Sequence, residues 1–394
     1  MEMLIDILDS FQSGWKKSEY LGDLVAILND MVIPSYAVLD ATIQDNNAVM
    51  SKEWADIISA MKDAGILKLF IPPEHGGRKA SEHEIYFLME LFGYSSPGMG
   101  VIFVSHGRAV DVVLQGTEKQ KAEYLPKMAE GSLGAIAMTE EQAGSDVSTI
   151  GLMAKKSDKT YLLNGQKIFI SNSGLAEIYT VLANTKGVQG SRSLSLLLVN
   201  KGVPGLSIMG LADKEGLKIL PVGQLLFKDC PVPTENLVGT EGMGLFLALD
   251  VIDRGRIHIA GICCGLAYRI FREIYHYARQ RKQFDNLLTS SQDISFQLSD
   301  IYSRMNAARG LCLHALRQLG KSYYRVSSSQ AKLVASQMVM DVAAKAQVLM
   351  GGRGYFKNNL VNQLSADARG MEYLEGTSNI QKMIIASELF KLYR

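Results

Sequence analysis

The sequence predicts a mainly α-helical protein with a central β domain, and two observations lead to this fold class. Apolar residues recur at steps of three and four through residues 1–130 and again from Gly239 onward, a period typical of amphipathic helices. Residues 131–237 instead contain short β-type runs separated by frequent Gly and Pro. We therefore expect an N-terminal helical domain (1–130), a central β domain (131–237) and a C-terminal helical bundle (238–394).

The N-terminal domain is expected to be a helical scaffold. Its first helix is predicted at residues 4–15, and a later helix is expected to close at Gly65, since glycine readily takes the left-handed conformation. Helix starts are indicated where a hydroxyl side chain can accept a hydrogen bond from the first turn. These positions are Ser51, Ser81 paired with Glu84, and Thr117 paired with Gln120.

The other two domains differ in their hydrophobic period. Strands are predicted at 160–170, 178–183 and 194–199, with Asn164-Gly165 as a hairpin turn between apolar residues. No alternation of strands and helices is visible in this domain. The C-terminal domain is expected to be a bundle of long helices with short connections. These helices are predicted near residues 242–282, 289–320, 327–350 and 360–391.

Composition narrows the classes of function. Of the 394 residues, 47% are hydrophobic and 21% charged, and the formal net charge is +1. This is ordinary for a globular protein, and the lack of a basic run argues against a nucleic-acid partner. Four cysteines without a Cys-x-x-Cys pair and six scattered histidines predict no disulfide framework and no metal site. No signal peptide or bilayer-spanning stretch is visible, so we expect a cytoplasmic protein without membrane insertion.

Two stretches contain candidate catalytic or ligand-binding residues. In residues 371–381, Glu375 stands next to a glycine just before an expected helix; alone, such a carboxylate is more often a solvated helix-entry residue. Residues 137–149 combine small and hydroxyl side chains after an apolar strand, which suits a polar ring edge or a pyrophosphate, but equally a polar turn. No Gly-x-Gly-x-x-Gly follows a strand, and Ala315 stands where the first glycine of a phosphate-binding loop belongs.

Six motifs extend over nearly the whole chain: Leu67–Gly77, Thr139–Asp146, Lys167–Ser171, Arg279–Phe284, Gly351–Tyr355 and Leu374–Gln381. In content and in order they resemble the motifs of the acyl-CoA dehydrogenase family. The resemblance implies an N-terminal helical domain, a β-barrel-like middle domain, a C-terminal four-helix bundle, bound FAD, and a homotetramer or dimer. It also implies an acyl-CoA or acyl-carrier-protein substrate and a flavoprotein that accepts the electrons.

By the same resemblance, a set of residues is expected to hold FAD. Arg281 would reach the pyrophosphate of a neighbouring subunit's FAD, although from the residues alone it is equally a solvated basic helix end. Phe284 would pack on the adenine, and hydroxyls near Thr139 would bond the polar edge of the flavin ring. The implied set is Met138, Thr139, Gly144, Ser145, Phe169, Ile170, Ser171, Arg281, Gln283, Phe284, Gln292, Val348, Gly351, Gly352, Thr377 and Asn379.

Glu375 matches the usual catalytic base of the family. It would remove the α-proton of the acyl thioester while FAD N5 accepts the β-hydride. Some relatives carry the base just before Arg256, where this chain has Gly255, so Glu375 is the candidate at either location. Asp253 and Arg256 would contact the pantetheine arm of the substrate or form only a salt bridge within their helix. The implied substrate residues are Ser145, Asp253, Arg256 and Gly376.

The sequence also departs from the family pattern. Leu374 stands where many members have Tyr, Asp285 replaces the usual Gly, and Val348 occupies a position that commonly holds Gln. Gln363 and Ala366 replace basic residues. We therefore expect a divergent member, and a carrier-protein thioester in a biosynthetic pathway is one hypothesis for its substrate. The alternatives are a flavin oxidase or monooxygenase of the same fold, and a non-catalytic flavoprotein that binds a macromolecular partner.

Overall fold

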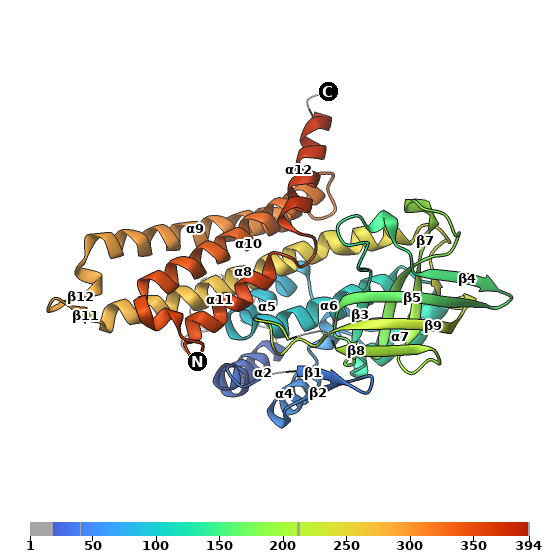
Figure 1. Cartoon of the computed structure of the whole chain (residues 1–394), viewed down its shortest axis with the longest axis horizontal. Coiled ribbons are helices and arrows are strands. Elements are labelled where there is room, and N and C mark those ends of the chain that lie inside the picture. Colours follow the sequence, from blue (N-terminus) through green and yellow to red (C-terminus); the bar gives the residue numbers. More distant parts are fainter. Residues whose placement is uncertain (1–18, 40, 211–212, 393–394) are drawn as a thin grey trace.

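The computed structural model describes residues 19–39, 41–210 and 213–392 (Figure 1). Helices form most of the described chain up to Glu130, an eight-stranded sheet follows, and long helices form the rest. The mainly α-helical fold with a central β domain is therefore confirmed. The first expected helix, at residues 4–15, lies outside the described residues.

The N-terminal part packs its helices around a hydrophobic interior, and the predicted helix starts are confirmed. The Ser51 hydroxyl accepts a hydrogen bond from the Trp54 N–H, and the capping boxes at Ser81 and Thr117 are both complete. Gly65, with a φ of 73°, follows the helix that it was expected to close. The helices are α2 (Glu19–Ile27), the π-helical turn η2 (Leu28–Val32), α3 (Ile33–Ser35), α4 (Lys52–Asp63), α5 (Glu82–Ser95), α6 (Pro97–Leu114) and α7 (Glu118–Glu130), with 3-10 turns η3 (Leu67–Phe70) and η4 (Pro73–His75).

One element of this part corrects the expectation of an entirely helical domain. Strands β1 (Ala41–Gln44) and β2 (Asn47–Met50) form an antiparallel hairpin. Their turn residues, Asp45 and Asn46, have φ angles of 49° and 64°, which Asp and Asn tolerate better than most residues. The Asp45-Asn46 pair is a turn signal that outweighs the weak helical period around it.

The central sheet is formed by strands β3 to β10. Hydrogen-bonded neighbours follow the order β10-β7-β6-β4-β5-β9-β8, and β3 pairs in parallel with β6. The long pair β5 and β9 is antiparallel, and so is the pair β6 and β7. The strands are β3 (Gly134–Ala137), β4 (Met153–Ser157), β5 (Thr160–Ser171), β6 (Ile178–Asn184), β7 (Leu194–Asn200), β8 (Leu206–Gly210), β9 (Val222–Pro233) and β10 (Leu237–Val238).

The hairpin turn predicted at Asn164-Gly165 is wrong, because β5 continues through it. The pairing of β5 with β9 shifts register at this point, so Gly165, with a φ of 136°, forms a bulge and not a turn. Asn164 exchanges hydrogen bonds with Asp229 on β9, at 3.0 Å and 2.9 Å. The turn before β5 contains Asp158, whose φ is 49°.

The C-terminal part is a bundle of long helices. One helix had been expected over 360–391, but residues 372–377 break it into α11 and α12. Because Gly376 has a φ of 92°, the helix cannot continue through this connection. The elements are α8 (Gly244–Gln280), the hairpin of β11 (Lys282–Gln283) and β12 (Asn286–Leu287), α9 (Gln292–Arg317), α10 (Tyr324–Leu349), the 3-10 turn η9 (Gly351–Tyr355), α11 (Leu360–Met371) and α12 (Ser378–Leu392).

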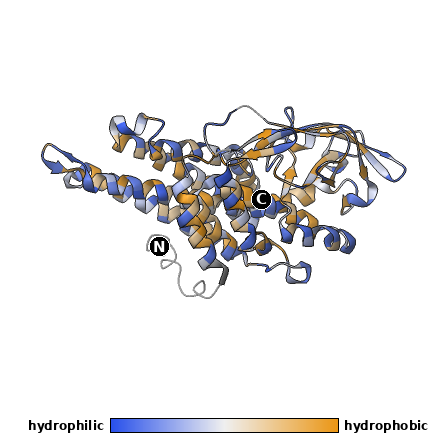
Figure 2. Cartoon of the chain, turned by 90° about the horizontal axis from the view of Figure 1, so that it is seen from below, coloured by the Kyte–Doolittle hydropathy of each residue, from blue (hydrophilic) through white to orange (hydrophobic). Residues whose placement is uncertain are grey.

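Helix α8 runs through the middle of the molecule and joins its parts. It contacts α5 and α6 of the N-terminal part as well as α9 and α10 of the bundle (Figure 1). Hydrophobic residues concentrate where these helices face one another, and hydrophilic residues cover their outer faces (Figure 2). The hairpin β11–β12 lies at the end of the bundle remote from the sheet, and α12 projects away from the rest. None of the helices in the described ranges combines the length and apolar character that crossing a bilayer requires.

Candidate active site

The connection between α11 and α12 holds Glu375 in a strained backbone conformation. Glu375 has a φ of 52°, a left-handed conformation that costs roughly 1 kcal/mol or more for a residue with a Cβ. Lys332 of α10 donates hydrogen bonds to the backbone oxygens of Glu372 (2.7 Å) and Gly376 (2.9 Å). Gln381 Nε2 donates to the backbone oxygens of Glu375 (3.0 Å) and Gly376 (2.9 Å). These bonds fix the connection, so the strain at Glu375 persists in the folded chain.

The Glu375 carboxylate lies directly against Gly255 of α8. A Cβ at position 255 would come within 2.6–2.8 Å of the carboxylate carbon and both of its oxygens. Real contacts are not this close, so glycine at 255 makes the room that Glu375 occupies. The position considered as an alternative place for a base is therefore part of the same site.

Charged groups surround the Glu375 carboxylate. Burial among protein atoms raises the pKa of Glu375 above the usual range of a glutamate, and Asp253 adds to the rise. The positive charges of Arg108, Arg256 and Lys332 oppose it, Arg108 most strongly. The residue is nevertheless partly accessible to solvent. A partly accessible carboxylate with a raised pKa suits a general base.

Asp253 and Arg256 form an ion pair within α8. Arg256 is buried and also donates a hydrogen bond to the Ser329 hydroxyl of α10, at 3.4 Å. Arg325 Nε approaches the other Asp253 oxygen at 3.8 Å. The intrahelical salt bridge foreseen as the alternative is therefore present, and contact of these two residues with a substrate stays a prediction.

The loop predicted to hold the flavin ring is tied to β5 by a buried ion pair. Lys167 Nζ lies 2.7 Å from Glu140 Oε1 and donates to the Met138 backbone oxygen at 2.8 Å. The Glu140 carboxylate also accepts two backbone N–H groups just before β4. The Ile168 N–H donates to the Thr139 backbone oxygen at 2.8 Å. The structure thus brings the first two predicted stretches of the flavin site together.

A β-bulge turns Phe169 out of the sheet. The register of β5 against β9 shifts between Lys167 and Ile170, and Phe169 has a φ of 57°. The Phe169 side chain is 64% exposed, whereas Ile170 beside it is buried. An exposed apolar ring in a strained conformation indicates a surface that another group covers. Phe169 and Ser171 keep accessible side chains, while Ile170 offers a ligand only its main chain.

Gly144 and Ser145 lie in the exposed turn that follows β3. A Cβ at Gly144 would meet no atom of this chain, so the packing of the chain does not require glycine there. Asp146 organises the turn, since its carboxylate accepts hydrogen bonds from the Ser148 N–H (3.1 Å) and hydroxyl (2.6 Å). An open glycine and an exposed hydroxyl leave space at this turn for a ligand.

A second set of predicted cofactor residues lies at the far end of the bundle, near β11 and β12 (Figure 1). Phe284 is 94% exposed there, and Val348 is 76% exposed. Arg281 follows α8, 26 residues beyond Gly255, which at about 1.5 Å per helical residue places it about 39 Å away. One chain therefore does not bring this set to Glu375. We call it the distal group: Arg281, Gln283, Phe284, Gln292, Val348, Gly351 and Gly352.

The hairpin of the distal group has a strained two-residue turn. Phe284 and Asp285 form its two-residue turn, with φ angles of 49° and 65°. Glycine adopts such angles freely, whereas both of these residues carry a Cβ, Phe284 being the less tolerant of the two. The exposed Phe284 ring is held at the tip of this strained turn.

Three further residues lie around the start of α12. The Thr377 hydroxyl accepts a hydrogen bond from the Ile380 N–H at 3.4 Å, so Thr377 caps the helix. Asn379 is exposed. Leu374 is partly buried against the core, so it places an apolar side chain next to Glu375 in the chain.

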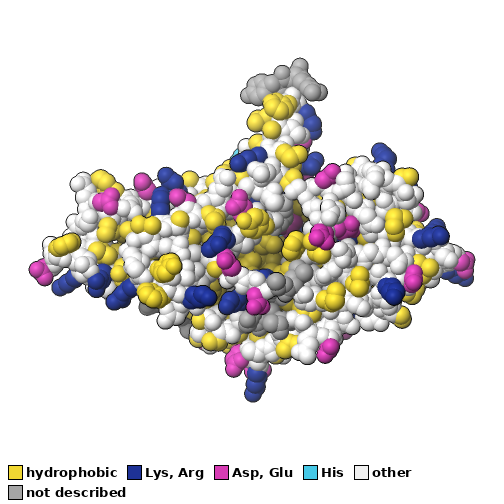
Figure 3. Space-filling model, in the orientation of Figure 1, with side chains coloured by type: hydrophobic (Ala, Val, Ile, Leu, Met, Phe, Trp, Pro, Cys, Tyr) yellow, Lys and Arg dark blue, Asp and Glu magenta, His cyan; other side chains and the backbone are white. Residues whose placement is uncertain are grey.

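The face between the bundle and the β domain is hollowed beneath α12, and hydrophobic side chains line the hollow (Figure 3). The connection that carries Glu375 lies at the foot of α12, where α12 leaves the bundle (Figure 1). The residues present fit the expected FAD in part. The exposed Phe169 ring and the open turn at Gly144 suit a planar ring and a phosphate, but the distal group fits the same cofactor only when another copy of the chain supplies it.

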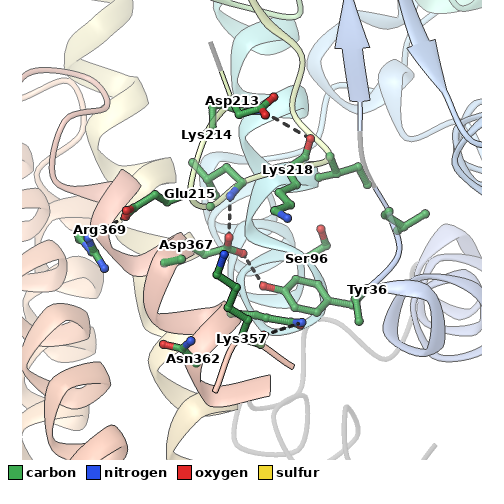
Figure 4. Close-up of a pocket in the computed structure, with 17 residues that line it drawn as sticks. Tyr36, Ser96, Asp213, Lys214, Glu215, Lys218, Lys357, Asn362, Asp367 and Arg369 are labelled. Atoms are coloured by element: carbon green, nitrogen blue, oxygen red, sulfur yellow. Dashed lines mark hydrogen bonds and ion pairs between the residues drawn. The ribbon is translucent and has the colours of Figure 1, made fainter. Parts of the chain in front are cut away.

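A separate cavity of about 460 Å³ lies between α11, residues 213–219 and the segment after α3 (Figure 4). Asp367 accepts hydrogen bonds there from the Tyr36 hydroxyl (2.7 Å) and the Leu217 N–H (2.6 Å). Burial raises the pKa of Asp367 to about 6. Gln363 and Ala366 line this cavity, but none of the predicted cofactor or substrate residues does. It is therefore not the predicted active site.

Two buried cations near Glu375, Arg108 and Lys332, were not predicted from the sequence. Both are almost completely buried, and burial lowers the pKa of Lys332 to about 8. Each is a basic residue within a largely apolar helix, and such a residue needs a partner when it is buried. That signal was available in the sequence, but it does not say which element supplies the partner.

Comparison with known proteins relates the whole chain to one family. Residues 29–132, 135–230 and 242–390 match the N-terminal, middle and C-terminal domains of acyl-CoA dehydrogenase. The short-chain specific acyl-CoA dehydrogenase of Clostridium acetobutylicum is 34% identical over 339 residues, covering 85% of this chain and 89% of that protein.

Two solved structures are similar over nearly their whole length. The butyryl-CoA dehydrogenase of Megasphaera elsdenii is 29% identical, with a TM-score of 0.86 over 96% of this chain and 100% of its own. A prolyl acyl carrier protein oxidase is 25% identical, with a TM-score of 0.83 over 95% of this chain and 100% of its own.

Proposed function

Because the chain belongs to the acyl-CoA dehydrogenase family, we propose that it forms a Cα=Cβ double bond in an acyl thioester, with Glu375 as the base that removes the α-proton. The observation that carries this proposal is the Glu375 carboxylate held against Gly255 of α8. Its raised pKa and its partial accessibility support the same role.

FAD is the cofactor of this family and of this chain. When bound, it supplies the acceptor for the hydride that leaves the β-carbon. Met138, Thr139, Phe169 and Ser171 would hold the flavin ring, because the Lys167–Glu140 pair keeps this loop beside the end of β5. The turn with Gly144 and Ser145 would lie near the phosphates or the substrate.

The protein's own contribution to the reaction is to accept a proton and to stabilise negative charge. Glu375 would take the α-proton on a carboxylate oxygen. Among the described residues, nothing accepts a hydrogen bond from the Glu375 backbone N–H, so this group is available to the thioester oxygen, where charge develops. Lys332 and Gln381 would keep the carboxylate and the N–H in position, since they hold the backbone carbonyls of this connection.

The distal group would act on the FAD of a second copy of the chain. Arg281 suits a pyrophosphate, because a guanidinium forms charge-assisted hydrogen bonds with phosphate oxygens. The exposed Phe284 and Val348 side chains suit an apolar contact that a single chain leaves open. We therefore propose a dimer or tetramer in which each FAD lies between two chains.

The thioester would be carried by CoA or by a carrier protein. The likeness to butyryl-CoA dehydrogenase supports CoA, and the likeness to the prolyl acyl carrier protein oxidase supports a carrier protein. Rates of flavin reduction with one acyl group on both carriers decide between them. A clear preference for CoA would contradict the carrier-protein hypothesis.

The proposed reaction is tested by anaerobic bleaching of the flavin with a panel of acyl thioesters. Glu375→Gln is expected to slow bleaching about 10³-fold, because removal of a general base costs roughly 10²–10⁴-fold. Glu372→Gln, on the same connection, is the matched control and is expected to react at nearly the wild-type rate, since the substitution keeps the backbone oxygen that Lys332 binds. Bleaching of the Glu375→Gln protein at the wild-type rate would refute the assignment of the base.

A second candidate differs in the electron acceptor. The likeness to the prolyl acyl carrier protein oxidase favours direct reaction with oxygen in place of a flavoprotein. Stopped-flow mixing of the reduced protein with oxygen tests this: reoxidation faster than turnover supports the oxidase, and slow reoxidation supports the flavoprotein acceptor.

A further inference from the structure

A relay of three polar side chains, of which Arg108 and His258 are buried and Glu82 is partly exposed, crosses the interface of α5, α6 and α8. Arg108 Nη2 lies 3.1 Å from His258 Nδ1, and His258 Nε2 lies 2.9 Å from Glu82 Oε2. Arginine can only donate, so Nδ1 accepts and the His258 proton is on Nε2, which donates to Glu82. Burial lowers the pKa of His258, in agreement with a neutral ring. The relay therefore fixes the Arg108 guanidinium in one orientation.

Arg108 of α6 packs against the same face of α8 that the Glu375 carboxylate contacts. Its Nη1 donates to the Val251 backbone oxygen at 2.9 Å. Val251, Gly255 and His258 follow one another at steps of four and three, so they share one face of the helix. The Glu375 carboxylate covers the middle of this face, at Gly255, and Arg108 covers both ends of it. Arg108 is accordingly the cation that acts most strongly on Glu375.

The Arg108 guanidinium keeps one donor unused. Its side chain is 1% exposed, and Nε has no hydrogen-bond partner among the described residues. A buried donor left without a partner costs roughly 1–3 kcal/mol, so such a group calls for a ligand that completes it. Charge around it is already matched, since Asp111 lies 3.1 Å from Arg108 and 3.9 Å from Arg254. What Arg108 lacks is a hydrogen-bond acceptor.

We propose that Arg108 selects the acyl group, by donating a hydrogen bond to an oxygen atom that the acyl chain carries just beyond the reacting carbons. This inference rests on the proposed function, because it uses Glu375 to place the α-carbon. With its α-carbon at Glu375, the acyl group would extend along the face of α8 that Glu375 and Arg108 both contact. A short acyl group with a terminal hydroxyl or carboxylate then satisfies the guanidinium, whereas an alkyl group of the same length leaves it unpaired and buried.

The test uses pantetheine thioesters, since pantetheine is the arm that CoA and carrier proteins share. Three four-carbon acyl groups are compared by anaerobic flavin bleaching: butyryl, 4-hydroxybutyryl and succinyl. In each, Glu375 would take the α-hydrogen as a proton and the bound flavin would supply the acceptor for the β-hydrogen as a hydride, so the end group would stay unchanged. We expect at least one oxygen-bearing thioester to exceed butyryl by about 10-fold or more in rate constant over dissociation constant. The faster of the two identifies a hydroxyl or a carboxylate.

Variants locate the preference at Arg108. Arg108→Met is expected to abolish the oxygen preference, and Arg108→Lys is expected to retain part of it, because lysine keeps a donor without the planar fork. Arg254→Met, on the neighbouring face of α8, is the matched control and is expected to leave the preference unchanged. Because Arg108→Met leaves Asp111 without its close partner and can impair folding, Arg108→Lys serves as the second variant.

Binding provides a readout that does not need turnover. Calorimetric titration of the FAD-loaded Glu375→Gln protein is expected to show tighter binding of the preferred oxygen-bearing thioester than of butyryl. A wild-type protein that butyryl bleaches at least as fast as the other two, or a preference that survives in both Arg108 variants, overturns the inference alone. If none of the thioesters bleaches the flavin, the proposed function fails and the inference fails with it.

Discussion

The residues that the sequence assigns to one active site lie in two regions with opposite surroundings. Around Glu375, the supporting side chains are inside the protein: Lys332 is 0% exposed and Arg256 2%. In the distal group, Phe284 is 94% exposed. The first region has its hydrogen bonds supplied by α8, α10 and α12 of the same chain. The second offers a partly buried guanidinium and an aromatic ring that the described residues leave exposed.

This difference separates two ways of building a site. The region around Glu375 is pre-organised, since buried donors hold the backbone of the base before any ligand arrives. The distal group is finished only by association, because exposed apolar side chains at the end of a bundle gain free energy when another surface removes them from water. Changes in the first region should therefore act on the reaction, and changes in the second on cofactor retention and assembly.

The largest effect within this comparison is expected from Gly255→Ala. A methyl group at this position meets the Glu375 carboxylate at 2.6–2.8 Å, so the carboxylate has to move. A displacement of about 1 Å costs on the order of 10²-fold in rate, and we expect that loss in the flavin bleaching rate with FAD content unchanged. Gly310→Ala on α9, where a Cβ meets nothing, is the control and should keep the full rate. Equal rates for both variants would contradict the close contact.

A smaller effect is expected from Arg281→Gln in the distal group. Loss of a charge-assisted hydrogen bond should weaken FAD binding about 10-fold, measured by equilibrium dialysis, while Arg279→Gln should change it little.

Oligomers that contain two different variant chains test whether Arg281 acts on the FAD of a second chain. At limiting FAD, a co-expressed mixture of Arg281→Gln and Glu375→Gln chains should bleach faster than either variant alone, because each site combines residues of two chains. No recovery in the mixture would place Arg281 on the FAD of its own chain, or on none.

The smallest effect is a shift in pH dependence at the base. Glu375 must be ionised to accept a proton, and burial raises its pKa, so the bleaching rate should fall with decreasing pH at a higher pH than an ordinary glutamate would give. Arg108 on α6, Arg256 on α8 and Lys332 on α10 oppose the rise, and Asp253 on α8 adds to it. Arg108→Gln should therefore move this acid limb further up in pH. Arg254→Gln should leave it in place, and a shift of the same size there would argue against the specific role of Arg108.

Sequence reasoning was most successful where the signal is local. The capping boxes at Ser81 and Thr117 and the helix start at Ser51 are confirmed, because an N-cap depends on residues three apart in one turn. It failed at Asn164-Gly165, where a partner strand decides between a turn and a bulge, and at Asp45-Asn46, where a turn pair interrupts a weak helical period. The first case depends on pairing between the distant strands β5 and β9, which no local window contains, whereas the second is a local turn between neighbouring strands that the helical interpretation of residues 1–130 missed.

The sequence by itself determined the family, the order of the three domains along the chain and the candidate base, because local motifs and hydrophobic period carry that information. Only the tertiary structure decided what surrounds Glu375. Gly255, Arg108 and Lys332 come from three helices that are far apart in sequence, and they meet because packing brings α6, α8 and α10 against the α11–α12 connection. Because they are buried, the charges of Arg108 and Lys332 act on the pKa of Glu375 more strongly than they would in water.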